Sequence, residues 1–369
     1  MNTFGVYFKR HFLSTWIRPI IFSTFGILLL MVTINAEYNS WNNDYNSGRL
    51  ITESLLGYVS IFTAIIATIV PILEFSHFNN KKNIDTLFSL PIDKTKMLLA
   101  HYINGILHIT LSVTAIYVVW IVSWVYAPYT ALHEGYSMLS YVFIMLGAIV
   151  LYTIYSAVFL QANTTVDGCA FMLLYSFVFF IMLHLVYILL HEYTELELNG
   201  LRNLLSSTVL PFGLLDSITI CFDPIIEPHV DYIVIGGNYT TETAYIYKYG
   251  NIADVPINSY LPIFIFYILL AVGGAILTLK TFKLRSPLNV GEISDSWFGY
   301  KVLGPIFSIC GVLIFNSQEL FNVPFSIFVV IFMFLGYMLY RRGVKFKIPD
   351  IIVMSVTTLI AIFGKSLGL

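Results

Sequence analysis

EFSHFNNKKNIDTLFSLPIDKTKM (residues 74–97) decides how this chain is organised, because it is a polar, lysine-bearing stretch between two long apolar segments. The segments on either side, residues 55–73 and 98–126, each reach roughly the 20 residues that a helix needs to cross a bilayer. We therefore predict two membrane spans joined by a short polar connection. The same pattern of long apolar runs continues in both directions along the chain.

The composition excludes a soluble domain. Of the 369 residues, 58% are hydrophobic and 11% are charged, whereas soluble domains carry about 25% charged residues. The runs are unbroken and do not show the alternating pattern of roughly ten-residue barrel strands. We predict an all-α polytopic membrane protein with a six-span core and two to three additional C-terminal membrane segments.

The predicted domains follow from the apolar runs. Residues 1–16 place aromatic side chains at intervals of four, which predicts an amphipathic interfacial helix. A six-span core occupies residues 17–280, a cytoplasmic linker residues 281–301, and additional segments residues 302–369. Polar residues 37–49 and 161–168 are expected to be a loop and a turn. The expected core spans are residues 19–34, 55–73, 98–126, 138–160, 169–190 and 260–279, and the later apolar runs are residues 302–315, 323–340 and 348–364.

The longest segment between spans, residues 191–259, is not uniformly polar. Residues 203–215 are apolar but too short to cross, which predicts a re-entrant or interfacial helix. Residues 231–250 have β-rich halves around Gly236, Gly237 and Asn238, which predicts a small hairpin. The whole segment carries nine acidic residues against two basic ones.

Charge asymmetry predicts the orientation. With the N-terminus in the cytoplasm and nine crossings, 15 of the 19 basic residues fall on the inner side, as the positive-inside rule requires. Residues 76–97 are then cytoplasmic and residues 191–259 lie outside.

No catalytic constellation is present, so we expect a protein that is not an enzyme. The three cysteines have no metal-ligand spacing. His184, His191 and Glu195 could share a helix face at the outer end of the fifth span, but their spacing is not that of a known zinc motif, and packing histidines are the preferred reading. We expect no metal or other cofactor in this chain and no nucleic-acid partner.

A family resemblance comes from the text of residues 85–96, DTLFSLPIDKTK, after an acidic residue that closes the second span. It resembles the permease subunits of type-2 ABC exporters of Gram-positive bacteria. A looser similarity follows the sixth span. The matching residues are Glu74, Lys81, Lys82, Asp85, Ser89, Leu90, Pro91, Ile92, Lys94 and Lys96, with Lys283, Arg285, Gly291 and Glu292 in the looser match.

The resemblance implies a multi-pass protein of the bacterial cell membrane. Its implied partners are cytoplasmic ABC ATPase subunits, which bind ATP and Mg, and a second permease, either a copy or a paralogue. A hydrophobic or amphipathic cargo, peptide-like or lipid, would pass between the permeases. The spans implied to face that pathway contribute Phe62, Phe171, Tyr175, Phe179, Met182 and Tyr187; lipid-facing positions are the alternative.

Physical reasoning gives residues 76–97 the role of a coupling segment. Residues 83–89 can form one or two helical turns with an apolar side, and a proline then ends them. An ordinary solvated inner loop is the alternative. The expected coupling residues are Glu74, Ile84, Asp85, Leu87, Phe88, Ser89, Leu90, Pro91 and Lys94.

Two other functional classes remain open from the sequence. One is an ion-coupled secondary transporter, although such carriers usually display acidic residues or broken helices near the bilayer centre. The other is a membrane sensor or immunity protein that binds a cationic peptide through its acidic outer segment.

Overall fold

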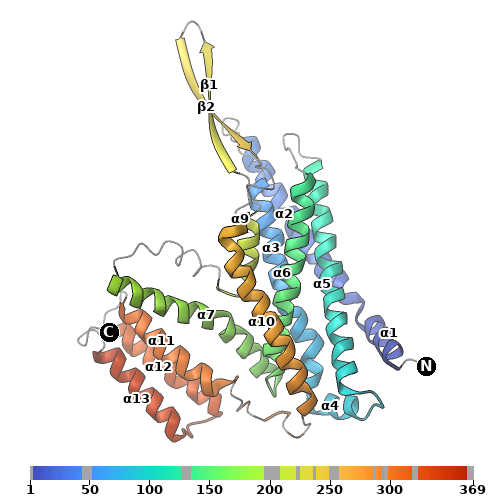
Figure 1. The fold of residues 1–369 in the computed structure, drawn as a ribbon, viewed down its shortest axis with the longest axis vertical. Coiled ribbons are helices and arrows are strands. Elements are labelled where there is room, and N and C mark those ends of the chain that lie inside the picture. Colours follow the sequence, from blue (N-terminus) through green and yellow to red (C-terminus); the bar gives the residue numbers. More distant parts are fainter. Residues whose placement is uncertain are drawn as a thin grey trace. The chain divides into compact units, whose positions relative to one another are not determined.

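The computed structural model describes most of the chain (Figure 1). The described residues are 3–43, 52–125, 134–194, 208–221, 225–235, 238–248, 257–285, 288, 290–292, 294, 298–317 and 323–363. Within them the chain is helical apart from one two-stranded hairpin. The elements are α1 (Thr3–Thr15), α2 (Ile17–Asn43), α3 (Thr52–Phe75), η1 (Ser76–Asn79), α4 (Lys81–Phe88), α5 (Lys94–Val125), α6 (Glu134–Leu160), α7 (Thr165–Thr194), α9 (Phe212–Cys221), β1 (Ile225–Ile235), β2 (Asn238–Lys248), α10 (Ile257–Leu284), α11 (Tyr300–Ser317), α12 (Val323–Arg341) and α13 (Ile348–Phe363).

Six of the described helices are long and apolar enough to cross a membrane, which confirms the predicted polytopic all-α class. The candidate spans are Ile17–Ala36, Leu56–Asn79, Lys94–Ser123, Met138–Leu160, Thr165–Tyr187 and Leu261–Lys283. The C-terminal helices are shorter, with apolar stretches at Tyr300–Leu313 and Ile348–Ile360.

Several predicted boundaries were wrong in the same direction, because helices extend beyond their apolar parts. α2 runs through the first half of the expected loop to Asn43, and residues 37–43 contain no glycine or proline that would end it. α7 begins at Thr165, inside the expected turn, because Thr164 caps it: its hydroxyl accepts a hydrogen bond from the Asp167 amide at 3.0 Å. Such capped polar turns extend helices without any apolar signal.

The short apolar helix expected at residues 203–215 lies further along the chain. α9 begins at Phe212, directly after Pro211, and continues to Cys221. Proline suits the start of a helix because it lacks the backbone N–H that an interior position would need. Residues 203–207 lie outside the described part of the chain.

The predicted hairpin is confirmed and is longer than expected. β1 and β2 pair antiparallel from Ile225 opposite Lys248 to Ile235 opposite Asn238. The two residues that connect the strands, 236 and 237, lie outside the described part.

The chain forms two compact units. Unit 1 comprises Met1–Val70, Leu99–Tyr152 and Leu214–Leu269, and unit 2 comprises Pro71–Leu98, Thr153–Gly213 and Leu270–Leu369. Within unit 1 the hairpin projects from one end of the helices and α1 lies at the other (Figure 1).

Unit 1 is held by polar contacts between helices as well as by apolar packing. The Tyr7 hydroxyl of α1 shares a hydrogen bond of 2.9 Å with His101 Nε2 of α5, and Asn104 donates to the Thr15 hydroxyl at 3.0 Å. The side chains of Ser60 on α3 and Thr219 on α9 meet at 2.6 Å. The N-terminal helix of the sequence analysis is therefore present and tied to α5, while its place at the membrane surface stays a prediction.

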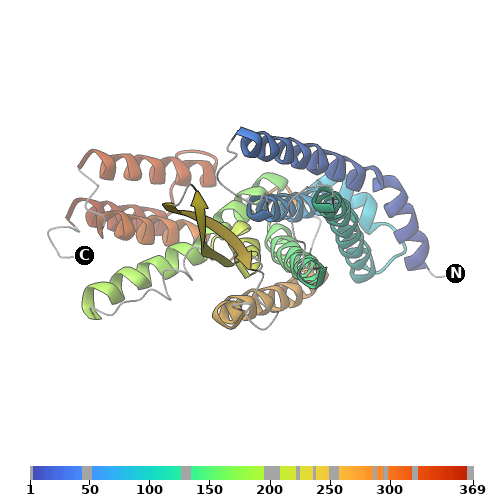
Figure 2. The same cartoon turned by 90° about the horizontal axis from the view of Figure 1, so that it is seen from above.

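Unit 2 contains the coupling segment, α7 and the three C-terminal helices. α11 packs against α7, α12 and α13, and both views show these four helices close together (Figures 1 and 2). The core where α7 meets α11 contains Ala162, Phe171, Val178 and Leu303. The additional segments therefore form a packed extension of the fifth predicted span.

Candidate coupling site

The coupling segment begins with the 3-10 helix η1, which follows α3 directly, and continues into the short helix α4. After η1, the Asn80 side chain accepts a hydrogen bond from the Lys82 amide at 3.1 Å and so caps α4. The Asn80 carbonyl accepts the amides of Asn83 and Ile84 at 3.1 and 3.0 Å. This cap defines the first turn of a helix of only eight residues, which would be marginal by itself.

The end of α4 is also defined by local hydrogen bonds. The Ser89 amide donates to the Asp85 carbonyl at 3.2 Å, and the Ile92 amide donates to the Leu90 carbonyl at 2.7 Å. Pro91 lies three residues after the last helical residue, Phe88. The helix therefore ends before the proline, in a turn that includes it.

Asp93 then starts α5. Its carboxylate accepts a hydrogen bond from the Thr95 hydroxyl, which is the main reason why the pKa of Asp93 lies below its ordinary value. The carboxylate is thus negative at neutral pH, where it suits the N-terminus of a helix. Asp93 was not among the predicted coupling residues, although an Asp before an apolar helix is a recognisable N-cap signal.

The predicted coupling residues divide into an inward and an outward set. Glu74 and Ile84 are fully buried, and Leu87 and Phe88 are half-buried. The outward set is exposed: Asp85, Ser89, Leu90 and Pro91. Leu90 is the large apolar member of that set, with 38% of its surface exposed.

Phe88 packs against another part of the same chain. Its ring lies edge-on to that of Phe282 near the end of α10, with centroids 6.3 Å apart. The Lys94 ammonium lies 4.4 Å from the Phe88 ring centroid, a cation–π geometry. Phe282 also contacts Phe78 of η1, at 5.0 Å. Phe88 and Lys94 therefore fix the coupling segment to α10, and Leu90 and Pro91 are left at its surface.

Arg285, directly after α10, joins the coupling segment to the turn between α6 and α7. Its guanidinium donates to the Leu160 carbonyl at 3.1 Å and the Ala162 carbonyl at 2.9 Å, and also to the Asn79 side-chain oxygen. Its own carbonyl accepts from the Lys94 ammonium at 3.1 Å. Burial lowers the pKa of Arg285 to about 10, so it remains a cation at neutral pH.

This arrangement has a clear electrostatic basis. Leu160 is the last residue of α6, where unpaired carbonyls carry partial negative charge that a cation stabilises. A planar guanidinium can reach several oxygens at once, which an ammonium cannot do with the same geometry. In the sequence, Arg285 stands out only through the looser family match, and its neighbours Asn79 and Leu160 carry no signal.

A second cluster continues from the same turn toward α11. Asp167 accepts hydrogen bonds from the Ser294 hydroxyl at 3.1 Å and the Tyr300 hydroxyl at 3.0 Å. Ser294 also accepts the Asn163 amide at 2.7 Å, and the Gly291 amide donates to the Asn163 carbonyl at 3.1 Å. The loosely matching residues after the sixth span thus lie against the α6–α7 turn within unit 2.

The predicted pathway residues lie in different environments. On α7, Phe171 is fully buried and packs on Tyr300 with centroids 4.9 Å apart, and the Tyr175 hydroxyl donates to the Phe298 carbonyl at 3.0 Å. Phe179 and Tyr187 are half-buried, and Met182 is exposed. In unit 1, Phe62 is half-buried on α3. α11 packs against α7, a contact that no local pattern in α7 predicts.

Comparison with known protein families gives a match that includes the coupling segment. Residues 48–221 match the model of the ABC-2 family transporter proteins. This region is similar to the ABC-2 family of transporter proteins. The match includes α3, the coupling segment and α5 to α9, so it confirms the recognition of a type-2 ABC permease, while the Gram-positive type stays a prediction. No curated protein and no solved structure matches the chain.

Proposed function

We propose that this ABC-2 family chain is the membrane permease subunit of an exporter, and that a separate cytoplasmic ATPase supplies the work. The observation that carries the proposal is the turn after α4. It presents Leu90 and Pro91 on the surface of a segment that Arg285 and Phe282 hold firmly on its inner side. An exposed apolar turn on a segment that is fixed in this way is better suited to the groove of a partner protein than to free solvent.

The inner contacts explain how a push on α4 could reach the spans. Asn79 and Lys94 lie on either side of α4 within the coupling segment, and both bond to Arg285. Arg285 in turn bonds to the end of α6 and follows directly on α10. Displacement of α4 would therefore be shared by α6, α7 and α10 through hydrogen bonds rather than absorbed by a flexible loop.

We propose a hydrophobic or amphipathic cargo, peptide-like or lipid, moved outward between this chain and a second permease copy or paralogue. Support comes from the apolar and aromatic character of α3 and α7, which suits such a cargo better than an ion. We further propose that the N-terminus and the coupling segment face the cytoplasm of a bacterial cell membrane.

Replacing Leu90 by Asp tests the coupling role. Because Leu90 is already exposed, the charge should leave insertion and folding intact while it weakens capture of the co-expressed ATPase and abolishes transport-linked, vanadate-sensitive hydrolysis. Leu288→Asp is the matched control, since Leu288 is 77% exposed outside the coupling segment. Equal ATPase capture by Leu90→Asp and wild type would contradict the proposal.

A sensor that binds a cationic peptide through the outer segment is the second candidate, and the hairpin favours it. Its two strands have 11 residues each and together carry three acidic residues and one lysine, which would give a cationic peptide a long stretch of chain to contact. Binding of a cationic peptide that is lost when residues 226–247 are shortened, with no ATPase captured by the full chain, would support the sensor instead.

A further inference from the structure

We propose that the turn between α12 and α13, residues 341–350, is a binding site for anionic phospholipid headgroups. The turn lies between two apolar helices, α12 and α13. Within it four basic residues meet one carboxylate: Arg341, Arg342, Lys345, Lys347 and Asp350. The proposal concerns a surface outside the coupling site and does not depend on the proposed function.

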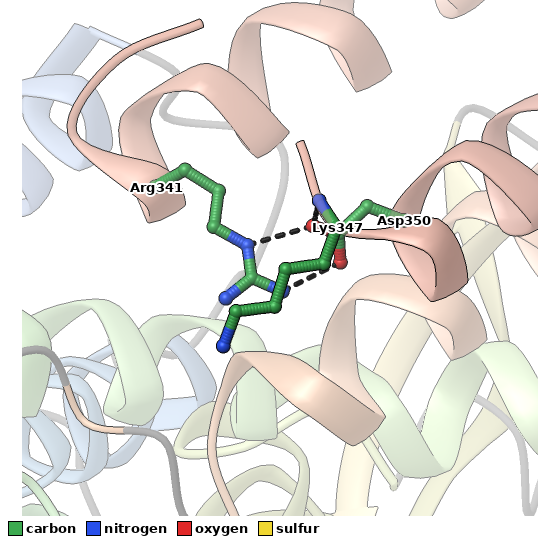
Figure 3. Close-up of polar contacts among 3 residues, drawn as sticks. All are labelled: Arg341, Lys347 and Asp350. Carbon is green, nitrogen blue, oxygen red and sulfur yellow. Dashed lines mark hydrogen bonds and ion pairs between the residues drawn. The ribbon is translucent and has the colours of Figure 1, made fainter. Parts of the chain in front are cut away.

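The single carboxylate is committed to the structure of the turn. Arg341 forms a two-point pair with Asp350, with nitrogen to oxygen distances of 2.7 and 2.8 Å (Figure 3). Asp350 also accepts the backbone amide of Lys347 at 2.9 Å, which caps the start of α13. The turn therefore keeps a net charge of +3 while its shape is fixed by the one internal ion pair.

The remaining cations are presented to the outside. Arg342, Lys345 and Lys347 are all exposed. Figure 3 shows the Lys347 side chain extending away from Asp350, along the same side as Arg341. Basic residues next to a membrane helix attract anionic lipid at about a fivefold gain in binding constant per charge.

Exposed apolar side chains alternate with these cations and favour a lipid surface over a soluble polyanion. Val344 is 66% exposed and Ile348 is 75% exposed. Phe346, between them, contacts Phe334 of α12 with ring centroids 5.1 Å apart. Apolar residues among cations at the end of a membrane helix are suited to the headgroup region, where both kinds of side chain are satisfied.

The backbone at Arg342 has a conformation that glycine adopts more easily than arginine. α12 ends with the Gly343 amide donating to the Met338 carbonyl at 3.0 Å, and Arg342 has a positive φ of 51°. Glycine is the residue usually found at this position of a helix end, because a side chain is strained there. Arg342 therefore carries an exposed cationic side chain at a position where glycine would relieve the backbone strain.

Native mass spectrometry of the detergent-purified full chain tests the site by counting bound phosphatidylglycerol and phosphatidylcholine. The triple variant Arg342→Gln, Lys345→Gln, Lys347→Gln should lose at least about tenfold in phosphatidylglycerol affinity. Lys81→Gln, Lys82→Gln, Lys96→Gln is the control, because it removes three exposed charges from the coupling segment. Equal losses in the two variants, or none in the first, would overturn the proposal.

Arg342→Gly separates lipid binding from folding. We expect an unfolding temperature equal to or above that of wild type, together with about fivefold weaker phosphatidylglycerol binding. Competition by millimolar glycerol phosphate would assign the site to free phosphate, and loss of ATPase capture with unchanged lipid binding would assign it to a protein partner. Either result would overturn the proposal.

Discussion

At the scale of single residues, Arg285 explains most about how this molecule is held together. Its guanidinium reaches the carbonyls of Leu160 and Ala162 and the side chain of Asn79. A loose resemblance placed Arg285 in a basic cluster, but its partners lie 123 to 206 positions away along the chain. Neither residue spacing nor hydropathy could show that these distant residues supply the oxygens that Arg285 binds.

Arg285→Lys should destabilise the protein although the charge is kept. One ammonium cannot satisfy three oxygens in this geometry, and buried acceptors left without a donor cost about 1 to 3 kcal/mol each. We expect a lower unfolding temperature in detergent and weaker stimulation of the partner ATPase. Lys283→Gln is the control, since Lys283 is exposed two residues earlier; equal shifts in both variants would contradict the role given to Arg285.

At the scale of elements, α4 shows how a short helix is made by its ends. The sequence predicted one or two helical turns here, and the structure has the helix at Lys81–Phe88. The prediction placed Ile84, Leu87, Phe88 and Leu90 together among the coupling residues. The structure instead turns Ile84 fully inward and leaves Leu90 outside, because the helix has ended before Leu90 and helical spacing no longer applies.

Asn80→Ala should loosen α4 without affecting the spans. Loss of an asparagine N-cap costs about 1 kcal/mol, a large fraction of what an eight-residue helix can hold. Hydrogen–deuterium exchange of residues 81–88 should therefore become several-fold faster, with exchange in α6 unchanged. Thr86→Ala, an exposed change on the same helix, should have a smaller effect; if it were as damaging as Asn80→Ala, the cap would not be what fixes the helix.

At the scale of the whole molecule, the six predicted spans and the hairpin are the expectations that the structure supports most directly. Long apolar runs predict membrane helices well, because each must satisfy its backbone groups internally. The hairpin was predicted from β-rich halves around a glycine pair, and its register centres on that point. The orientation in the membrane rests on the distribution of lysine and arginine.

Thiol labelling of intact cells tests that orientation. In a background with Cys169, Cys221 and Cys310 replaced, a cysteine at Thr243 in β2 should react with a membrane-impermeant maleimide. A cysteine at Lys82 in α4 should react only after the cells are permeabilised. The reverse pattern would invert the topology and remove the coupling segment from the side on which ATP is hydrolysed.

The sequence by itself determined the membrane class, the six long helices, the hairpin and the position of the coupling segment. Each of these depends on local properties: the length of apolar runs, turn residues and caps. Only the tertiary structure decided that α11, α12 and α13 form one packed group with α7, that Phe171 lies in its core, and that Arg285 and Asp167 join distant turns. The physical reason is that packing and buried hydrogen bonds depend on which surfaces meet in space, and an apolar helix looks the same in sequence whether lipid or protein covers it.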